Sequence, residues 1–492
     1  MGLTKQQQQV IDAVLDPTEP LIKIKAVAGA GKTFTLVEAA KAYRPKTGIY
    51  IAYNKAIADE AAQKFKGTNV RCSTIHSLAY AATVRPYGLN VGYFGPRNIQ
   101  GNNAHGKPLN YKEKMEVISH IKRFCLSDHL EPSDYIDAVK MDSDVADLFE
   151  DQLNMMADGS QVCTHDFYLK LYHVLMANGS IKIPSVDMLL VDECGDINKL
   201  TLAIFEMITA KKKIAVGDPM QNIYSFNETI NAFTELEDKG LEILLDQSFR
   251  VSSDIAFAVE DFVQRHLDSK FSFLGNTYPN GKPEVTTFAY ISRTNSGLLE
   301  EMFTLMESKT PFHLTRRIDT VLELPLILAN INSGNEITDK KWKHIENPRK
   351  AWESSPALKK QYRTAGEYVR YTNKDDEELK LAMKVLLKHS PKDLNTLTKY
   401  VKDNINVECD LTLTTAHSSK GLEFSSVTLA PDLNFAAEKA VAEIIDTKLG
   451  NCWNKEKVLN SLEEELRLYY VACSRAMTQL KNATLLKKVT TL

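Results

Sequence analysis

The residues best suited to chemistry form a run of small side chains closed by Gly31, Lys32 and Thr33. The run, AVAGAGKT at 26–33, follows a stretch typical of a strand and precedes one typical of a helix, although the usual pattern opens with Gly where this chain has Ala26. A loop so placed points backbone N–H groups and the helix dipole at one spot, which suits a polyphosphate. Lys32 would reach the outer phosphates and the Thr33 hydroxyl would hold Mg²⁺. A turn of small residues could also serve packing alone, but the Gly-Lys-Thr that ends this run favours phosphate binding over that alternative.

Two adjacent acids, Asp192 and Glu193, end the apolar run 187–191. Acids there could be an ordinary polar end of a strand. In a chain with a phosphate-binding loop they also have a chemical use, because Asp192 can hold Mg²⁺ through its water shell and Glu193 can orient and deprotonate an attacking water. The loop and the acids together predict a nucleoside triphosphatase.

A loop after the strand predicted at 213–218 carries a glutamine and two aromatic residues. Gln221 is placed to sense a γ-phosphate beside the nucleotide. Tyr224 and Phe226 offer faces on which bases could stack, although both would fit a hydrophobic core equally well.

Arginines occur near the ends of two further predicted elements. The run 243–250 is predicted as one strand ending in Arg250, which would approach a γ-phosphate. The run 463–476 is predicted as a helix in which Arg467 and Arg475 lie roughly two turns apart and thus on one face.

Strand and helix patterns alternate over 21–85, which indicates a parallel sheet with ligands at the carboxyl ends of its strands. The region 86–184 is mostly helical in pattern and is predicted to be an insertion without recognisable chemistry. A second polar, lysine-rich helical region spans about 297–408. There Trp342 and Trp352 lie among basic residues, a pattern that suits nucleic-acid binding or a solvated amphipathic helix.

The composition of the 492 residues is that of a globular protein, with 43% hydrophobic and 25% charged residues. The net charge of −3 gives no overall basic signal for nucleic acid, but a basic groove can occur on a neutral protein. Seven scattered cysteines without a CxxC pair suggest reduced thiols. The N-terminus shows no signal-peptide pattern, and no apolar run approaches the ~20 residues of a membrane span. We expect a chain that is not secreted and has no membrane partner.

Seven motifs are spread over nearly the whole chain. In order, they are AVAGAGKT at 26–33, STIHSLA at 73–79, VDECGD at 191–196, GDPMQNIYSF at 217–226, QSFR at 247–250, TTAHSSKGLEF at 414–424 and LYYVACSRA at 468–476. This set resembles the UvrD/Rep-like branch of superfamily 1 DNA helicases. The GDPMQNIYSF and QSFR motifs are most similar to the F-box DNA helicase subgroup, although no F-box is recognisable here.

The resemblance implies an α/β fold of two RecA-like parallel-sheet cores, each with a mainly helical insertion, and ATP between the cores. The expected parts are core 1A at 1–85 and 185–250, insertion 1B at 86–184, core 2A at 251–300 and 405–492, and insertion 2B at 301–404.

The resemblance also implies roles for individual residues. The implied catalytic residues are Lys32, Asp192, Glu193, Gln221, Arg250 and Arg475. The implied ATP-binding residues are Gln7, Ala28, Gly29, Ala30, Gly31, Lys32, Thr33, Phe34, Phe249 and Glu423. The implied Mg²⁺ ligands are Thr33 and Asp192. The implied single-stranded DNA path is lined by Tyr53, Asn54, His76, Tyr224, Phe226 and His417.

Among these, Gln7 and Phe249 would contact adenine, Glu423 would meet the ribose, and Arg250 and Arg475 would be arginine fingers. Two of the assignments have ordinary alternatives. The glutamine run that contains Gln7 could be a solvated polar face. A histidine such as His76 is more often a satisfied residue at the start of a helix than a ligand contact.

Four departures from the family pattern bear on mechanism. Gly195 replaces a glutamine that could link ATP to motion, and Phe34 replaces an arginine that packs on adenine. The sequence FNET at 226–229 replaces Trp-Arg-Gly-Ala, which removes an arginine that contacts DNA. The stretch after Arg475 is short for the strand-splitting hairpin of larger relatives. We therefore expect an element in 86–184 to separate the duplex.

The leading hypothesis is an ATP-driven DNA helicase that acts as a monomer on single-stranded and on forked or tailed duplex DNA. The family resemblance implies 3′→5′ movement. We expect the protein in the compartment that holds the DNA, which is the cytoplasm, the nucleoid or the nucleus. One alternative is a translocase that strips proteins from single strands without unwinding. Another is a nucleotide-gated DNA-binding scaffold without useful turnover.

Overall fold

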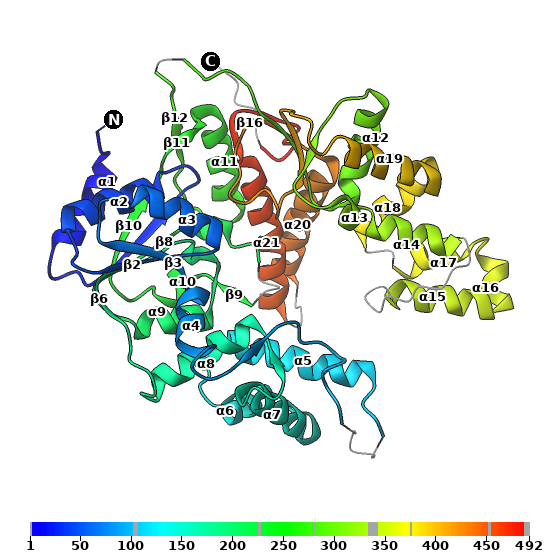
Figure 1. The fold of residues 1–492 in the computed structure, drawn as a ribbon. Helices are drawn as coiled ribbons and strands as arrows, with labels where there is room; N and C mark the ends of the chain where they lie inside the picture. Colours follow the sequence, from blue (N-terminus) through cyan, green and yellow to red (C-terminus); the bar gives the residue numbers. More distant parts are fainter. Residues whose placement is uncertain are drawn as a thin grey trace. The chain divides into compact units, whose positions relative to one another are not determined.

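The computed structural model describes residues 2–101, 107–224, 228–279, 281–332, 343–373, 376–450 and 454–486. It divides into two compact units, Met1–Asp246 and Gln247–Leu492 (Figure 1). The division falls just before the core boundary expected at 250, so Phe249 and Arg250 belong to the second unit. Phe226 and Trp342, both candidates for nucleic-acid contact, lie outside the described residues.

The first unit is built on a six-stranded sheet in the order β10-β1-β8-β6-β2-β3, in which every neighbouring pair is parallel. Its strands are β1 (Leu21–Ala26), β2 (Gly48–Ala52), β3 (Val70–Thr74), β6 (Ser185–Val191), β8 (Thr209–Gly217) and β10 (Leu241–Leu245). The strand β2 and the second halves of β6 and β8 are mostly apolar and buried, as expected where helices cover both faces of a parallel sheet. All carboxyl ends therefore meet at one edge, as predicted from the alternation of strands and helices.

Helices accompany this sheet, and those that follow β1, β2 and β3 begin near its carboxyl edge. They are α1 (Lys5–Leu15), α2 (Lys32–Tyr43), α3 (Lys55–Lys64), α4 (Ile75–Thr83), α9 (Lys199–Met207) and α10 (Ala232–Glu235). The helix α1 starts with a capping box between Thr4 and Gln7, which confirms the predicted Thr4 cap. Short 3₁₀ turns η1 (Cys194–Asp196) and η2 (Pro219–Gln221) follow β6 and β8.

The insertion of the first unit is helical, as predicted. Its elements are α5 (Tyr111–Leu126), α6 (Pro132–Val139), α7 (Ser143–Ala157) and α8 (His165–Ala177), with the short strand pair of β4 (Asn90–Val91) and β5 (Val162–Cys163). A second short pair, β7 (Ile197–Asn198) with β9 (Thr229–Ile230), lies outside the insertion. Phe124, Phe149 and Phe167 of these helices belong to the same hydrophobic cluster as Leu189 of β6. The insertion thus shares a hydrophobic core with the sheet and packs against it.

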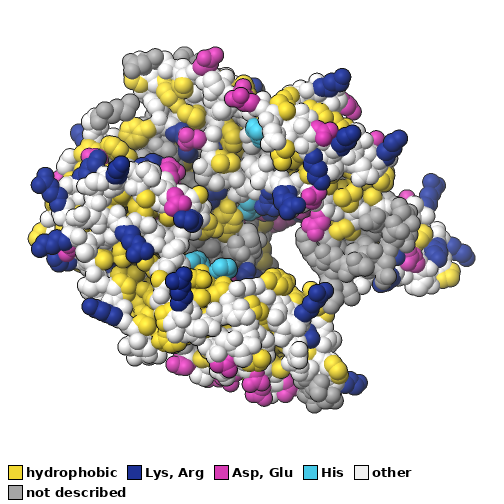
Figure 2. Space-filling view, in the orientation of Figure 1, with side chains coloured by type: hydrophobic (Ala, Val, Ile, Leu, Met, Phe, Trp, Pro, Cys, Tyr) yellow, Lys and Arg dark blue, Asp and Glu magenta, His cyan; other side chains and the backbone are white. Residues whose placement is uncertain are grey.

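Acidic side chains gather over α6 and α7 on the face drawn in Figure 2. The exposed ones are Asp134, Asp137, Asp142, Asp144, Asp147 and Asp151. This surface repels a phosphate backbone. A path for DNA on the first unit would therefore run elsewhere.

The second unit contains a five-stranded parallel sheet in the order β14-β15-β13-β16-β17. Its strands are β13 (Phe288–Ser292), β14 (His313–Leu314), β15 (Leu411–Thr415), β16 (Phe424–Leu429) and β17 (Ala476–Lys481). A separate parallel pair joins β11 (Gln247–Ser252) to β12 (Leu274–Asn276). The accompanying helices and turn are α11 (Ser253–His266), η4 (Ser296–Leu298), α12 (Leu299–Glu307), α20 (Pro431–Leu449) and α21 (Lys455–Cys473).

A second helical insertion lies between β14 and β15. It comprises α13 (Ile318–Val321), α14 (Glu323–Asn332), α15 (Lys343–Ser354), α16 (Pro356–Gln361), α17 (Ala365–Thr372), α18 (Glu377–Lys388) and α19 (Pro391–Asp403). Because β14 is an edge strand of the sheet, the insertion begins later than the expected residue 301. Trp352 packs against a small apolar cluster, and its Nε1 donates to the carbonyl of Tyr362 at 3.0 Å. For Trp352, the structure favours the amphipathic-helix alternative.

Two expected elements differ from those observed. The predicted strand 243–250 is two strands, β10 and β11, which pair in different sheets on either side of Asp246. The predicted helix 463–476 ends at Cys473, so Arg475 lies in a turn and does not share a helical face with Arg467. In the described part of the chain, no helix is long and apolar enough to cross a membrane.

Candidate functional site

The phosphate loop joins β1 to α2 at the carboxyl edge of the first sheet. Gly29 and Gly31 have φ of 76° and 75°, values that only glycine adopts readily, so the two glycines shape the turn. The helix α2 begins at Lys32, and Gly31 caps it without a side chain. The first N–H groups of α2 therefore point toward the loop, which makes it suited to an anion.

Lys32 and Glu193 form an ion pair across the loop, with 3.0 Å between Nζ and Oε1. Both side chains are largely buried, with 17% and 22% of their surface exposed. Glu193 follows β6 directly and has a left-handed φ of 53°, which is uncommon for a residue other than glycine. The predicted phosphate-binding lysine and catalytic base are thus in contact.

The charges at this edge determine the protonation of Lys32. Burial alone would lower the pKa of Lys32, but the carboxylates of Glu193, Asp192 and Asp218 outweigh it and hold that pKa above its usual value. Lys32 is therefore a permanent cation. Burial also raises the pKa of Asp192, although Lys32 partly opposes this shift.

Asp192 is buried and both of its carboxylate oxygens accept hydrogen bonds. The Tyr50 hydroxyl donates to Oδ2 at 2.5 Å, and the Glu193 N–H donates to Oδ1 at 2.8 Å. Thr33, in the first turn of α2, offers a hydroxyl at the same edge. These hard oxygen donors suit Mg²⁺, which binds to one or two protein oxygens together with phosphate and water. Among the described residues, no group of three or more metal-binding side chains forms a closed metal site.

The loops after β6 and β8 touch through their backbones. A Cβ at Gly195 would lie 2.5 Å from the carbonyl oxygen of Asp218, so a larger residue does not fit there without movement. The Asn222 side chain donates to the Gly195 carbonyl at 2.6 Å, and Gln221 Nε2 donates to Asp218 Oδ2 at 2.8 Å. At position 195, where the family pattern has a glutamine, this chain has a glycine, and the loops after β6 and β8 contact each other directly.

The residues expected to contact adenine lie partly in each unit. In the first unit, Gln7 is buried and its Oε1 accepts the Thr4 N–H at 3.0 Å, while Phe34 is 48% exposed. Phe249 lies on β11 of the second unit and is 38% exposed. The polar-face alternative for Gln7 is thus wrong, since this side chain is inside.

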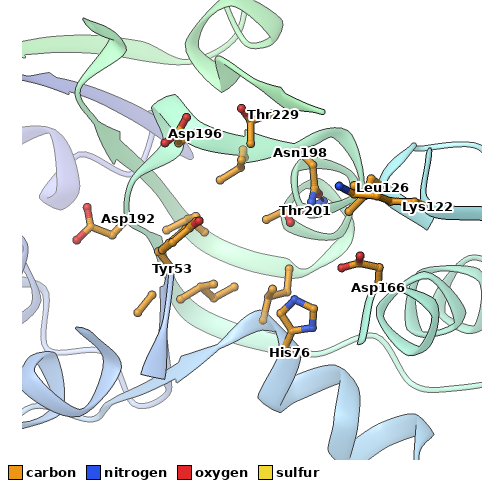
Figure 3. A pocket seen from close by; sticks show the side chains of 15 residues that line it. Tyr53, His76, Lys122, Leu126, Asp166, Asp192, Asp196, Asn198, Thr201 and Thr229 are labelled. Atoms are coloured by element: carbon orange, nitrogen blue, oxygen red, sulfur yellow. Dashed lines mark hydrogen bonds between the residues drawn. The ribbon is translucent and has the colours of Figure 1, made fainter. Parts of the chain in front are cut away.

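A cavity of about 450 Å³ lies beside Asp192 on the first unit (Figure 3). It is lined by two of the predicted DNA contacts, Tyr53 and His76. In Figure 3, His76 of α4 and Asp166 of α8 point into the cavity from below, and Asn198 lies across from them. The cavity is thus lined both by residues at the edge of the sheet and by residues of the helical insertion.

The chemistry of the cavity suits an uncharged polar ring better than a phosphate. Burial lowers the pKa of His76, so its ring is neutral at neutral pH, and its Nδ1 is buried without a hydrogen-bond partner. The Thr229 hydroxyl is also buried without a partner. The charged lining residues are Lys122 and three acids, Asp166, Asp192 and Asp196.

Arg250 and Glu423 lie together in the second unit, with 3.0 Å between Nη1 and Oε2. Arg250 Nη2 also donates to the Ser474 carbonyl at 3.2 Å. The neighbouring Arg475 is 2% exposed and donates to the carbonyls of Val471 and Leu422 at 3.0 and 3.3 Å. The structure thus brings both predicted arginine fingers and the predicted ribose contact to one place.

The remaining predicted DNA contacts are spread over both units. Asn54 caps α3 through the Ile57 N–H at 2.9 Å, and Tyr224 lies in the loop after η2. His417 lies in the turn after β15 of the second unit. Sequence analysis missed Tyr50 and the cavity residues Lys122 and Asp166. A hydroxyl inside an apolar strand was the only signal for Tyr50, and none was present for the other two.

Two family models cover almost the whole chain. The one described as an AAA domain matches residues 7–227, and the one described as a UvrD-like helicase C-terminal domain matches residues 196–483.

Two curated relatives are similar over nearly all of this chain. The F-box DNA helicase protein 1 of Schizosaccharomyces pombe is 26% identical over 551 residues, which cover 97% of this chain and 57% of that protein. The F-box DNA helicase 1 of Gallus gallus is 24% identical over 520 residues, which cover 96% of this chain and 48% of that protein. The chain therefore spans about half the length of these relatives.

Proposed function

Because this chain belongs to the family of UvrD-like helicases, we propose that it is an ATP-driven DNA helicase that moves along single-stranded DNA. The observation that carries the proposal is the contact of Lys32 with Glu193, beside Asp192, at the end of a phosphate loop. In the proposal, Lys32 is the phosphate-binding cation, Glu193 the base and Asp192 a metal ligand, and the contact of Lys32 with Glu193 supports these roles. The names of the curated relatives, which are DNA helicases, support the same activity.

In the proposed site, the first unit holds the phosphates and activates water. Backbone N–H groups of 28–31 and the Lys32 ammonium bind the phosphate oxygens. Thr33 and Asp192 would hold Mg²⁺, which neutralises charge on the transferred phosphoryl group when bound. Glu193 orients the attacking water and accepts its proton.

The ion pair of Lys32 with Glu193 implies an exchange on nucleotide binding. A γ-phosphate would compete with Glu193 for the single charge of this ammonium, so Lys32 would move toward the phosphate and its contact with the Glu193 carboxylate would weaken. The base would then become available only when its substrate is present.

The second unit would supply the remaining groups of the proposed site. Arg250 and Arg475 would stabilise charge that develops on the phosphates, Glu423 would meet the ribose, and Phe249 would join Gln7 and Phe34 at adenine. To reach a phosphate, Arg475 would have to leave the carbonyls of Val471 and Leu422 in its own unit. The family resemblance implies that ATP binding brings the two cores together.

We propose that the four parts of the chain serve these roles as two cores and two insertions. Core 1A would comprise 1–85 and 185–246, insertion 1B 86–184, core 2A 247–315 and 405–492, and insertion 2B 316–404. Single-stranded DNA would cross Tyr53, Asn54, His76, Tyr224, Phe226 and His417, and one base would enter the cavity beside Tyr53. Family resemblance supports 3′→5′ movement.

Strand displacement from 3′-tailed and 5′-tailed duplexes, with Lys32→Ala as control, tests the function. Displacement of the 3′-tailed substrate alone would support the proposal in full. Strong DNA-stimulated ATPase without displacement would favour the translocase that strips proteins from single strands. Absence of ATPase would overturn the motor and favour a nucleotide-gated scaffold.

Replacing Tyr53 with alanine is expected to weaken the binding of single-stranded DNA by roughly 5- to 150-fold, from the ~1–3 kcal/mol that stacking on an aromatic ring contributes per base. Fluorescence anisotropy with a labelled oligonucleotide measures this affinity. Tyr93→Ala is the matched control, because Tyr93 is 86% exposed on the same unit and does not line the cavity. Equal losses in both variants would refute the assignment.

A further inference from the structure

Tyr50 is a fully buried tyrosine in the middle of β2, a strand that is otherwise apolar. In the parallel pairing of β2 with β6, Tyr50 lies opposite Leu190. Because side chains alternate along a strand, Tyr50 and Asp192, two residues beyond Leu190, project to the same side of the sheet. The register thus puts the phenol and the carboxylate on the same side of the sheet, and the hydrogen bond between them shows that they meet.

The phenol is held in place by packing as well as by its hydrogen bond. The rings of Tyr50 and Phe65 lie 5.2 Å apart between centroids and are tilted by 43°. With no exposed surface, the Tyr50 ring has little freedom to turn away from Asp192. The Tyr50 hydroxyl therefore offers a fixed donor at 2.5 Å from Oδ2.

The bond from Tyr50 and the bond from the Glu193 N–H engage one lone pair on each carboxylate oxygen of Asp192. Each oxygen retains a lone pair that can face a metal-bound water. A carboxylate fixed on two sides has one orientation before any ligand arrives. Fixing a metal ligand in this way raises its affinity, because less conformational freedom is lost on binding.

We propose that Tyr50 is a positioning residue for the magnesium of the nucleotide site, which it serves by holding the Asp192 carboxylate in the orientation that accepts the metal's water shell. This inference rests on the proposed function, since it takes Asp192 to be the metal ligand. Tyr50 itself touches neither nucleotide nor metal. A purely structural tyrosine would affect folding and leave the metal affinity of the folded protein unchanged.

The test is the affinity of Mn²⁺ for the Tyr50→Phe variant in the presence of ADP, measured by electron paramagnetic resonance on the full chain. Loss of a hydrogen bond to a metal ligand typically costs about 10- to 100-fold in metal affinity, and we expect a loss in that range. Binding of ADP in EDTA should change by less than about twofold, because no metal is involved. The Mg²⁺ midpoint of ATP hydrolysis should rise in parallel.

Tyr135→Phe is the matched control. It removes the hydroxyl of a buried tyrosine in the same unit, one that lies on α6 of the insertion, 3.2 Å from His120 Nδ1. In an Asp192→Asn background, Tyr50→Phe should add little to the loss of Mn²⁺ affinity, because the two changes act on one interaction.

Three results would overturn the inference. These are an unchanged Mn²⁺ affinity, an equal loss in Tyr135→Phe, or loss of ADP binding in EDTA, which would make the hydroxyl a requirement for folding. The proposed function is judged separately. A wild-type chain that binds Mn²⁺ and ADP but hydrolyses no ATP would contradict the motor and leave the comparison of Mn²⁺ affinities intact.

Discussion

Replacing Glu193 with glutamine is expected to lower the ATPase rate by about 10²- to 10⁴-fold, the range for loss of a general base, and to tighten the binding of ATP. The ATPase rate falls while the affinity for ATP rises because Glu193 forms an ion pair with Lys32, with 3.0 Å between Oε1 and Nζ. A neutral amide competes less with phosphate for the ammonium, so Lys32 is free to bind nucleotide. Steady-state hydrolysis and equilibrium binding of a fluorescent ATP analogue measure the two effects.

Two controls isolate this effect. Lys32→Ala should lose both hydrolysis and ATP affinity, because it removes the cation itself. Glu206→Gln removes an acid from another ion pair of the first unit, with Lys239 at 2.6 Å, and should change neither quantity. A Glu193→Gln variant that binds ATP more weakly than the wild type would contradict the exchange of partners by Lys32.

Replacing Arg475 with lysine is expected to lower the ATPase rate by about 10³-fold or more, the range known for arginine fingers, with little change in ATP affinity. Lysine keeps the charge but has no planar fork with which to bind two phosphate oxygens. Rapid-quench hydrolysis and nucleotide binding, together with thermal unfolding, separate catalysis from stability.

The stability measurement matters because the Arg475 guanidinium now donates to carbonyls of Val471 and Leu422 inside its own unit. Arg467→Lys is the matched control, since Arg467 lies on α21 and pairs with Glu463 at 3.5 Å. If Arg475→Lys kept more than about a tenth of the rate, the assignment as an arginine finger would be wrong.

Much of the fold was predictable from sequence because its signals are local. The phosphate loop lies between a strand and a helix of clear pattern, and the capping residue Thr4 marks the start of α1. The break between β10 and β11 was not predictable. Residues 241–252 contain no glycine or proline, and which sheet each half joins is decided by partners elsewhere in the chain. The end of α21 before Arg475 likewise has no local breaker.

In the candidate site too, the residues of local motifs were predictable from sequence, and the contacts between distant residues were not. Lys32 and Glu193 could be named from motifs, whereas their ion pair joins residues 161 positions apart. Tyr50 and Asp192 are 142 positions apart, and only the pairing of β2 with β6 brings them together. The cavity residues Lys122 and Asp166 come from an insertion whose placement on the sheet depends on side-chain packing.

The contact between Gly195 and Asp218 restricts which residues fit where the loops after β6 and β8 meet. A Cβ at Gly217 would lie 2.8 Å from the N atoms of Cys194 and Gly195, so both loops require a hydrogen atom in place of a side chain where they meet. A larger residue at either position would push the loop that carries Asp192 away from the loop that carries Gln221. The close packing of the two loops therefore depends on glycine at both positions.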